Sequence, residues 1–160
     1  MKTIATWTTV LAVMLLGASV ARAHCQIPCG IYDDEARVLM IEEHITTIEK
    51  SMKLVRELSA AEEPDHNQIV RWVANKDHHA DELTEIVTYY FMAQRLNPAD
   101  AADEAKAEAY QHKLHLLHAM VFHAMKAKQT TDPQHTEALR KLLGEFEVAY
   151  FGHAVERPGA

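Results

Sequence analysis

DEARVLMIEEHITTIEKSMKLVREL is the sequence of residues 34–58, and its apolar residues recur at alternating steps of three and four. The positions are Val38, Ile41, Ile45, Ile48, Met52 and Val55. Such steps place the apolar side chains on one face of an α-helix, and the acidic residues at its start suit a helix N-terminus. The segment therefore predicts a long amphipathic helix whose apolar face must be buried against other elements.

Three further stretches carry the same helical periodicity, and short connections separate them. The second helix is expected over residues 65–95, where Lys76 interrupts the apolar stripe and indicates a polar layer or an interface. The third is expected over residues 101–128, and the fourth from about 133 to 152. With no convincing strand pattern, this arrangement predicts an all-α fold, an antiparallel four-helix bundle.

Length and charge narrow the possible functions. The 160 residues suffice for one domain with a single core, here residues 34–152, followed by a loose tail over 153–160. The formal charge is −7, and it becomes −9 without Lys2 and Arg22 of the leader described next. An acidic chain is a poor partner for nucleic acid, and it attracts an anionic substrate only if basic groups lie near the site.

The N-terminal residues have the three parts of a secretory signal peptide. Met1-Lys2 is basic, residues 4–20 are mostly apolar, and residues 21–23, Ala-Arg-Ala, form a small-x-small cleavage site. The apolar run is shorter than the roughly 20 residues of a membrane span. We therefore expect residues 1–23 to be removed, the mature chain to begin at His24, and the protein to be exported to the periplasm or the extracellular space.

The only two cysteines lie in residues 24–32, HCQIPCGIY, directly after this site. Once cleaved, His24 offers an α-amine and an imidazole, Cys25 an amide nitrogen and a thiolate, and Cys29 a second thiolate. Pro28 and Gly30 favour the turn that brings Cys29 round. Two nitrogens and two sulfurs in a plane, with the imidazole axial, suit Ni(II) or Cu(II). A Cys25–Cys29 disulfide is the alternative that the residues alone leave open.

The run from His24 to Asp33 resembles the N-terminal nickel hook of nickel superoxide dismutase, H-C-x-x-P-C-G-x-Y, at every specified position. The resemblance implies a homohexamer of four-helix bundles with one nickel ion per subunit. It also implies conversion of superoxide to dioxygen and hydrogen peroxide by cycling between Ni(II) and Ni(III). Carried over to this chain, it assigns amine and axial imidazole to His24, amide nitrogen and thiolate to Cys25, thiolate to Cys29, and a place beside the substrate approach to Tyr32.

The chain departs from the family pattern around the axial imidazole. Family members hold that ring through a glutamate on the first helix and an arginine on the second. Here Leu39 or Met40 stands where the glutamate is expected, and His79 replaces the arginine. We expect Glu42, Glu43 or His79 to substitute as the partner that orients the ring.

Two other interpretations of the sequence concern a metal carrier and a second metal site. An exported nickel or copper carrier would use the same amine, amide and thiolate donors without catalysis. A second metal site could use His112, His115 and His118, which follow one another at three-residue steps with His123 beyond. We expect these histidines instead at the polar edge of the bundle or between subunits.

Overall fold

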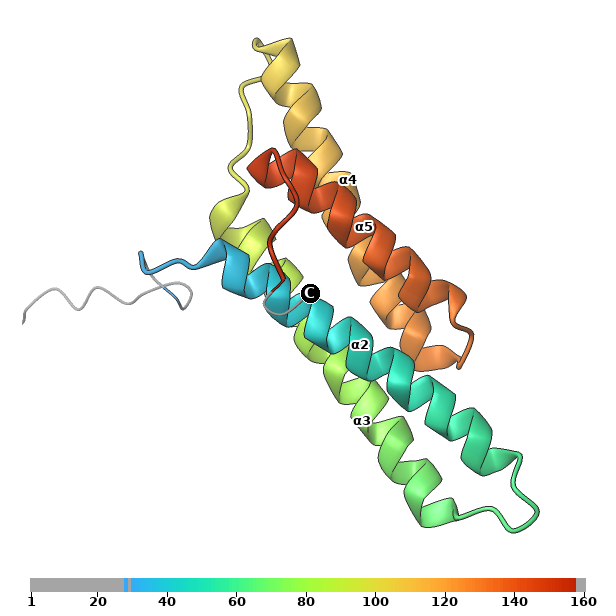
Figure 1. The fold of residues 1–160 in the computed structure, drawn as a ribbon. Helices are drawn as coiled ribbons and strands as arrows, with labels where there is room; N and C mark the ends of the chain where they lie inside the picture. Colours follow the sequence, from blue (N-terminus) through green and yellow to red (C-terminus); the bar gives the residue numbers. More distant parts are fainter. Residues whose placement is uncertain (1–27, 29, 158–160) are drawn as a thin grey trace, which may run out of the picture.

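The structure is a computed structural model that describes residue 28 and residues 30–157. The predicted signal peptide and His24, Cys25 and Cys29 lie outside the described residues. Within these described residues, four helical segments follow one another (Figure 1). They are α2 (Asp34–Ser59), α3 (His66–Glu85) continued by η1 (Ile86–Arg95), α4 (Glu104–Gln129) and α5 (Gln134–Phe151).

The helices pack as an antiparallel four-helix bundle, which confirms the predicted fold class. Contacts join α2 to α3, α3 to α4, α4 to α5, and α5 back to α2, so each helix has two neighbours. The apolar stripe predicted for the first helix faces this core, and all six of its members are buried. Aromatic side chains from η1 and α5 close one end, where the rings of Phe91 and Phe146 meet edge to face at 5.1 Å.

Aspartates begin three of the helices. The side chains of Asp33, Asp65 and Asp103 each accept a hydrogen bond from the backbone N–H three residues ahead. A carboxylate in this position satisfies an N–H that the helix leaves free and favours the positive end of the helix dipole. At the other end of the chain, Gly152 has φ of +82° and stops α5 in a left-handed conformation that glycine adopts without strain.

The second predicted helix changes its winding before it ends. Residues 66–85 are α-helical, whereas Ile86–Arg95 form a π-helix, with the Leu96 N–H donating to the carbonyl of Phe91. The apolar periodicity continues through both parts, so the pattern predicted the helix and missed its winding. Long π-helices are rare and are often found at functional sites.

Lys76 forms the polar layer that its place in the apolar stripe indicated. Its side chain is 3% exposed, and its Nζ donates to the backbone carbonyls of Ala127 and Lys128 and to the carboxylate of Asp77. The two carbonyls belong to the C-terminal end of α4, where a helix leaves acceptors free and favours a positive charge. Lys76 therefore ties α3 to the end of α4.

The expected loose tail is wrong for the part that the structure describes. Val155 is buried, and its N–H donates to the carboxylate of Glu147 on α5. Arg157 forms an ion pair with the same carboxylate at 2.6 Å and another with Glu42 on α2 at 2.7 Å. Because Glu147 is nearly inaccessible to solvent, the guanidinium neutralises a charge that the core encloses. Val155 and Arg157 thus attach the end of the described chain to α2 and α5.

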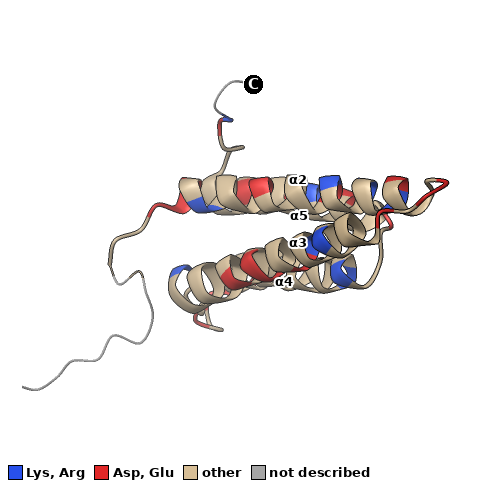
Figure 2. Ribbon diagram, turned by 90° about the horizontal axis from the view of Figure 1, so that it is seen from below, with Lys and Arg blue, Asp and Glu red and all other residues tan. Residues whose placement is uncertain are grey.

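Acidic and basic residues are interspersed along the helices, as Figure 2 shows. Most ion pairs are exposed, such as Lys53 with Glu57 and Lys128 with Asp81. Among the described residues, no helix is long and apolar enough to cross a membrane.

Candidate metal centre

The described part of the predicted hook ends directly at the first turn of α2. Gly30 has φ of +79°, in the left-handed region, which agrees with the turn expected there. Tyr32 follows, with its ring partly exposed beneath the guanidinium of Arg95, whose Cζ is 4.3 Å from the ring centroid. The edge of the Tyr32 ring meets Tyr90 at 5.9 Å. The predicted site residue Tyr32 is therefore held by a cation–π contact and an aromatic contact.

Asp34 holds the beginning of α2 to two other helices. Its carboxylate accepts hydrogen bonds from Arg95 Nε at 2.9 Å and Arg95 Nη2 at 2.8 Å, so the guanidinium binds both oxygens. The hydroxyls of Tyr90 and Tyr150 donate to the same carboxylate at 2.6 and 2.8 Å. Such bidentate, charge-assisted contacts are geometrically specific. This four-residue group, Asp34, Tyr90, Arg95 and Tyr150, is called the Asp34 anchor below.

The π-helix allows two members of the Asp34 anchor to meet one carboxylate. Tyr90 and Arg95 are five residues apart, and in an α-helix such residues point about 140° away from each other. The wider i to i+5 winding of η1 turns their side chains toward a common side. The π-helical winding thus lets Tyr90 and Arg95 both bind the first residue of α2.

The charges in the Asp34 anchor shift the pKa values of its members. Burial by itself raises the pKa of Asp34, but hydrogen bonds from Arg95, Tyr90 and Tyr150 outweigh it and lower the pKa. Burial and the hydrogen bond to Asp34 raise the pKa of Tyr90 to about 12, and the same two causes raise that of Tyr150 to about 12. At neutral pH the carboxylate is therefore ionised and both phenols remain protonated donors.

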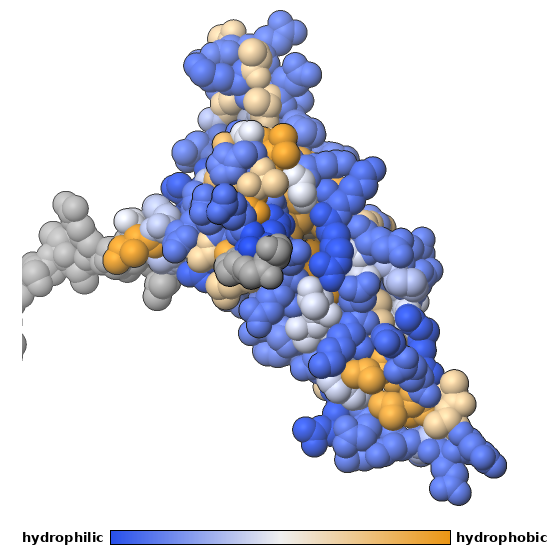
Figure 3. All heavy atoms as spheres, in the orientation of Figure 1, coloured by the Kyte–Doolittle hydropathy of each residue, from blue (hydrophilic) through white to orange (hydrophobic). Residues whose placement is uncertain are grey.

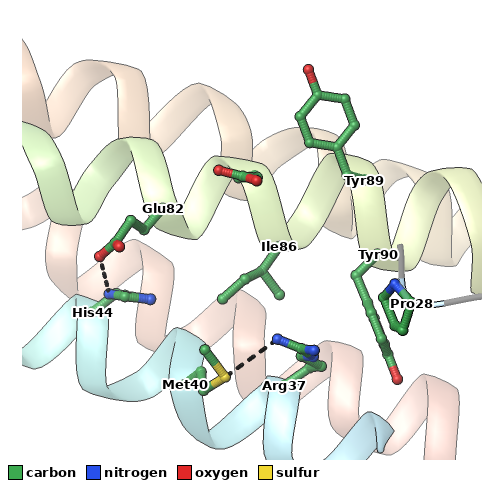
Figure 4. Close-up of a pocket in the computed structure, with 9 residues that line it drawn as sticks. Pro28, Arg37, Met40, His44, Glu82, Ile86, Tyr89 and Tyr90 are labelled. Atoms are coloured by element: carbon green, nitrogen blue, oxygen red, sulfur yellow. Dashed lines mark hydrogen bonds and ion pairs between the residues drawn. The ribbon is translucent and has the colours of Figure 1, made fainter. Parts of the chain in front are cut away.

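A cavity of about 260 Å³ lies beside the Asp34 anchor, between α2 and the helix formed by α3 and η1. Its lining residues are Pro28, Arg37, Met40, His44, Glu82, Glu85, Ile86, Tyr89 and Tyr90 (Figure 4). Pro28, from the predicted hook, stands at one end next to Tyr90, and His44 with Glu82 forms the other end. Pro28 therefore borders a cavity whose far wall is polar.

Two histidines and a glutamate converge at this far wall. The Nδ1 atoms of His44 on α2 and His79 on α3 are 2.8 Å apart. A carboxylate oxygen of Glu82 lies 3.6 Å from Nδ1 of His44 and 3.5 Å from Nδ1 of His79. Burial lowers the pKa of His44, and the positive charge of a protonated His79 would lower it further, against the opposing effect of Glu82. Uncharged His44 can therefore act as a ligand at neutral pH.

The three residues predicted to orient the axial imidazole, Glu42, Glu43 and His79, have different surroundings in the structure, and Glu43 is exposed. Met40, which stands where the family's glutamate is expected, lines the cavity, and its Sδ lies 3.6 Å from Nη1 of Arg37. His79 lies at the far wall beside His44, whereas Glu42 is engaged by Arg157 and does not line the cavity. The structure thus brings His79 near the cavity and places Glu42 in the contact with the C-terminal tail.

The histidines of the third helix do not form a metal site among the described residues. His112, His115 and His118 are exposed on α4, in line with the expected polar edge. His123 instead contacts His135 on α5, with their Nδ1 atoms 3.1 Å apart. Within residues 28 and 30–157, the one group of three or more potential ligands is His44, His79 and Glu82. That group was not predicted from the sequence, although His79 and Glu82 have the i, i+3 spacing of one helix face.

The fold and the site define a helical-bundle metalloprotein in which a cysteine- and histidine-bearing segment precedes α2. The family model of nickel-containing superoxide dismutase matches residues 19–154. The chain belongs to this family, which confirms the resemblance: it is an oxidoreductase that uses nickel and disproportionates superoxide. No curated protein and no solved structure matches the chain.

Proposed function

We propose that this superoxide dismutase acts outside the cytoplasm and holds its nickel ion through His24, Cys25 and Cys29. The family match over residues 19–154, together with the hook motif in residues 24–32, carries the proposal. An amine, a deprotonated amide and two thiolates form a donor set that suits a tetragonal nickel ion. When bound, nickel supplies one-electron cycling between Ni(II) and Ni(III). Nothing in the part of the chain that the structure describes favours a carrier without turnover.

The residues below the hook support this role by fixing its exit from the bundle. Asp34 is only two residues beyond Tyr32, and the Asp34 anchor connects it to η1 and α5. The contact between Arg95 and Tyr32 then sets the position of the tyrosine that borders the substrate approach. Rigid support of this kind keeps ligands in the geometry that a metal centre requires.

Two guanidinium groups supply the local positive charge that an anionic substrate needs near an acidic chain. Arg95 lies against Tyr32, but the carboxylate of Asp34 neutralises much of its charge. Arg37 lines the cavity and has no carboxylate within ion-pair distance among the described residues. Its guanidinium lies 5.1 Å from the ring centroid of Tyr90. Glu82 and Glu85 line the same cavity, so the role of electrostatic guide for superoxide falls to Arg37, the one arginine or lysine among the lining residues.

Exposed apolar side chains near the hook support assembly into an oligomer, which the family resemblance specifies as a homohexamer. Ile31 is 83% exposed and Tyr89 53% exposed, and Met40 is also accessible at the cavity. Figure 3 shows several hydrophobic groups on a largely hydrophilic face, and one of them lies at the N-terminal end of the described residues. A neighbouring subunit that covers this region would also shield the hook thiolates from oxidation. Sedimentation equilibrium should give six chains per particle, and a monomer at working concentration would exclude the hexamer.

Single substitutions test the nickel ligands. Cys25→Ser and Cys29→Ser should each abolish nickel binding and superoxide consumption, because each removes a thiolate donor. Helical circular dichroism should persist, since both positions precede the bundle. His115→Ala, on an exposed face of α4, is the control and should retain nickel and activity. Full nickel content in either serine variant would refute the assignment, as would a Cys25–Cys29 disulfide in the active protein, seen by intact mass before and after reduction.

A further inference from the structure

We propose that His44, His79 and Glu82 form a second metal site, separate from the hook, which binds one divalent transition-metal ion of the zinc type. The three residues come from two helices, with His44 on α2 and the other two one turn apart on α3. Two imidazoles and a carboxylate form a common ligand set for zinc, and they also accept Ni(II) and Co(II). The proposal does not depend on the hook holding nickel.

The distances between the donor atoms match those around a tetrahedral ion. Ligands at about 2.0–2.1 Å from zinc in tetrahedral geometry are separated from one another by about 3.3–3.4 Å. The Nδ1 atoms of His44 and His79 are 2.8 Å apart, and the Glu82 oxygen is 3.6 and 3.5 Å from them. The three atoms therefore form one face of a tetrahedron of nearly the required size. Small side-chain shifts would complete it.

Hydrogen bonding alone leaves this group incompletely paired. A single proton can lie between the two Nδ1 atoms at 2.8 Å, so one neutral imidazole donates and the other presents its lone pair. The glutamate oxygen lies at 3.5 Å or more from both nitrogens, longer than an ordinary hydrogen bond. A cation at the centre would use both lone pairs and the carboxylate charge at the same time.

The surroundings provide support and access for an ion. His44 is almost fully buried, whereas Glu82 is 40% exposed, so one side of the group is enclosed and the other is open. His44 and Glu82 both line the cavity, which would hold the water or small anion at a fourth coordination position. The second oxygen of Glu82 lies 3.4 Å from Nε2 of His78, and this contact can orient the carboxylate as an outer partner.

The test uses the full mature chain, without a histidine tag, in which Cys25→Ser and Cys29→Ser disable the hook. After treatment with a chelator, the protein is dialysed against Zn²⁺, Ni²⁺ or Co²⁺ in separate samples. Metal content is measured by mass spectrometry, and the Co²⁺ form by its visible absorption and by X-ray absorption. We expect one ion per chain, with nitrogen and oxygen scatterers and no sulfur.

Further variants of this hook-disabled protein assign the ion to the three residues. Glu82→Gln keeps the size of a partly exposed side chain and removes its charge, so it should leave the fold intact. Glu82→Gln and His79→Ala should each weaken Zn²⁺ binding by more than about tenfold, the loss that an outer partner of a metal can already cause. His115→Ala is the control and should bind as the parent does.

The proposal fails if the hook-disabled protein binds no ion, or if either variant binds as tightly as this parent. Circular dichroism of each variant shows whether a loss of binding reflects unfolding. Failure of the hook assignment would be seen separately, as superoxide dismutase activity that survives Cys25→Ser and Cys29→Ser.

Discussion

Replacing Asp34 by asparagine should destabilise the bundle more than the loss of any exposed ion pair. The substitution keeps the size of the side chain and removes the charge that faces Arg95. It also places an NH2 group among the phenol and guanidinium donors, which need acceptors. The Asp34 anchor would then lose its centre, and α2 would lose its attachment to η1 and α5.

The expected loss lies between the values for exposed and buried ion pairs. Exposed pairs contribute about 0–1 kcal/mol, and breaking a fully buried pair costs about 3–5 kcal/mol. The Asp34 side chain is 15% exposed and that of Arg95 is 29% exposed, so this pair is mostly enclosed. Two tyrosine hydrogen bonds to the same charge add to its effect. We therefore expect Asp34→Asn to lower the free energy of unfolding by about 3 kcal/mol.

Urea denaturation followed by circular dichroism measures this loss, on metal-free protein at one fixed concentration. Asp81→Asn is the matched control, because Asp81 pairs with Lys128 at 2.6 Å but its side chain is 64% exposed. The control should lose less than about 1 kcal/mol. Equal losses for Asp34→Asn and Asp81→Asn would show that the Asp34 anchor stabilises the bundle no more than an exposed ion pair does.

The effect of Asp34 should also depend on pH in a definite direction. Its pKa is lower in the folded protein than the ordinary value of 3.8. A carboxyl group with a lowered pKa stabilises the fold fully above its unfolded pKa, and this contribution disappears as the pH falls through the folded pKa. The difference between wild type and Asp34→Asn should therefore be largest near neutral pH and shrink below about pH 4.

Three further substitutions test other parts of the account. Lys76→Met leaves buried carbonyls at the end of α4 without their donor, and urea denaturation should show a loss of about 1–3 kcal/mol, against little change for the exposed Lys53→Met. Arg157→Ala leaves the enclosed carboxylate of Glu147 without its cation and should lower the free energy of unfolding by about 2–4 kcal/mol. Because the pKa of Glu147 is lowered in the folded protein, this loss should diminish as the pH falls, and a loss that stays constant with pH would contradict the assignment. Arg37→Gln should lower kcat/KM for superoxide severalfold and weaken its dependence on ionic strength, whereas Lys53→Gln, farther along the same helix, should change neither.

Helix periodicity predicted the fold because the spacing of apolar residues within each helix indicates which of its faces is buried. The apolar stripe of residues 34–58 is buried as expected, and the helix ends agree to within a few residues. Lys76 could be recognised as a polar layer because it interrupts a stripe. The π-helical winding of residues 86–95 could not, because the same residues satisfy an α-helical pattern equally well.

The sequence did not allow contacts between distant parts of the chain to be predicted. Asp34 was recognised as an acidic residue at a helix start, but its partners Arg95 and Tyr150 come from two other helices. The ion pairs of Arg157 likewise depend on how α2, which carries Glu42, packs beside α5, which carries Glu147. The group of His44, His79 and Glu82 depends on the register between α2 and α3, which periodicity leaves undetermined.

The proposed coordination requires a free α-amine at His24, and a change of the N-terminal residue probes this requirement. Protein released from a cleavable fusion so that it begins at His24 is compared with protein that carries one additional glycine ahead of His24, after both are loaded with nickel. We predict that the first binds one nickel ion per chain and consumes superoxide, and that the second loses both properties because its terminal amine is displaced from the metal. Full nickel content and full activity in the extended protein would contradict the proposed coordination.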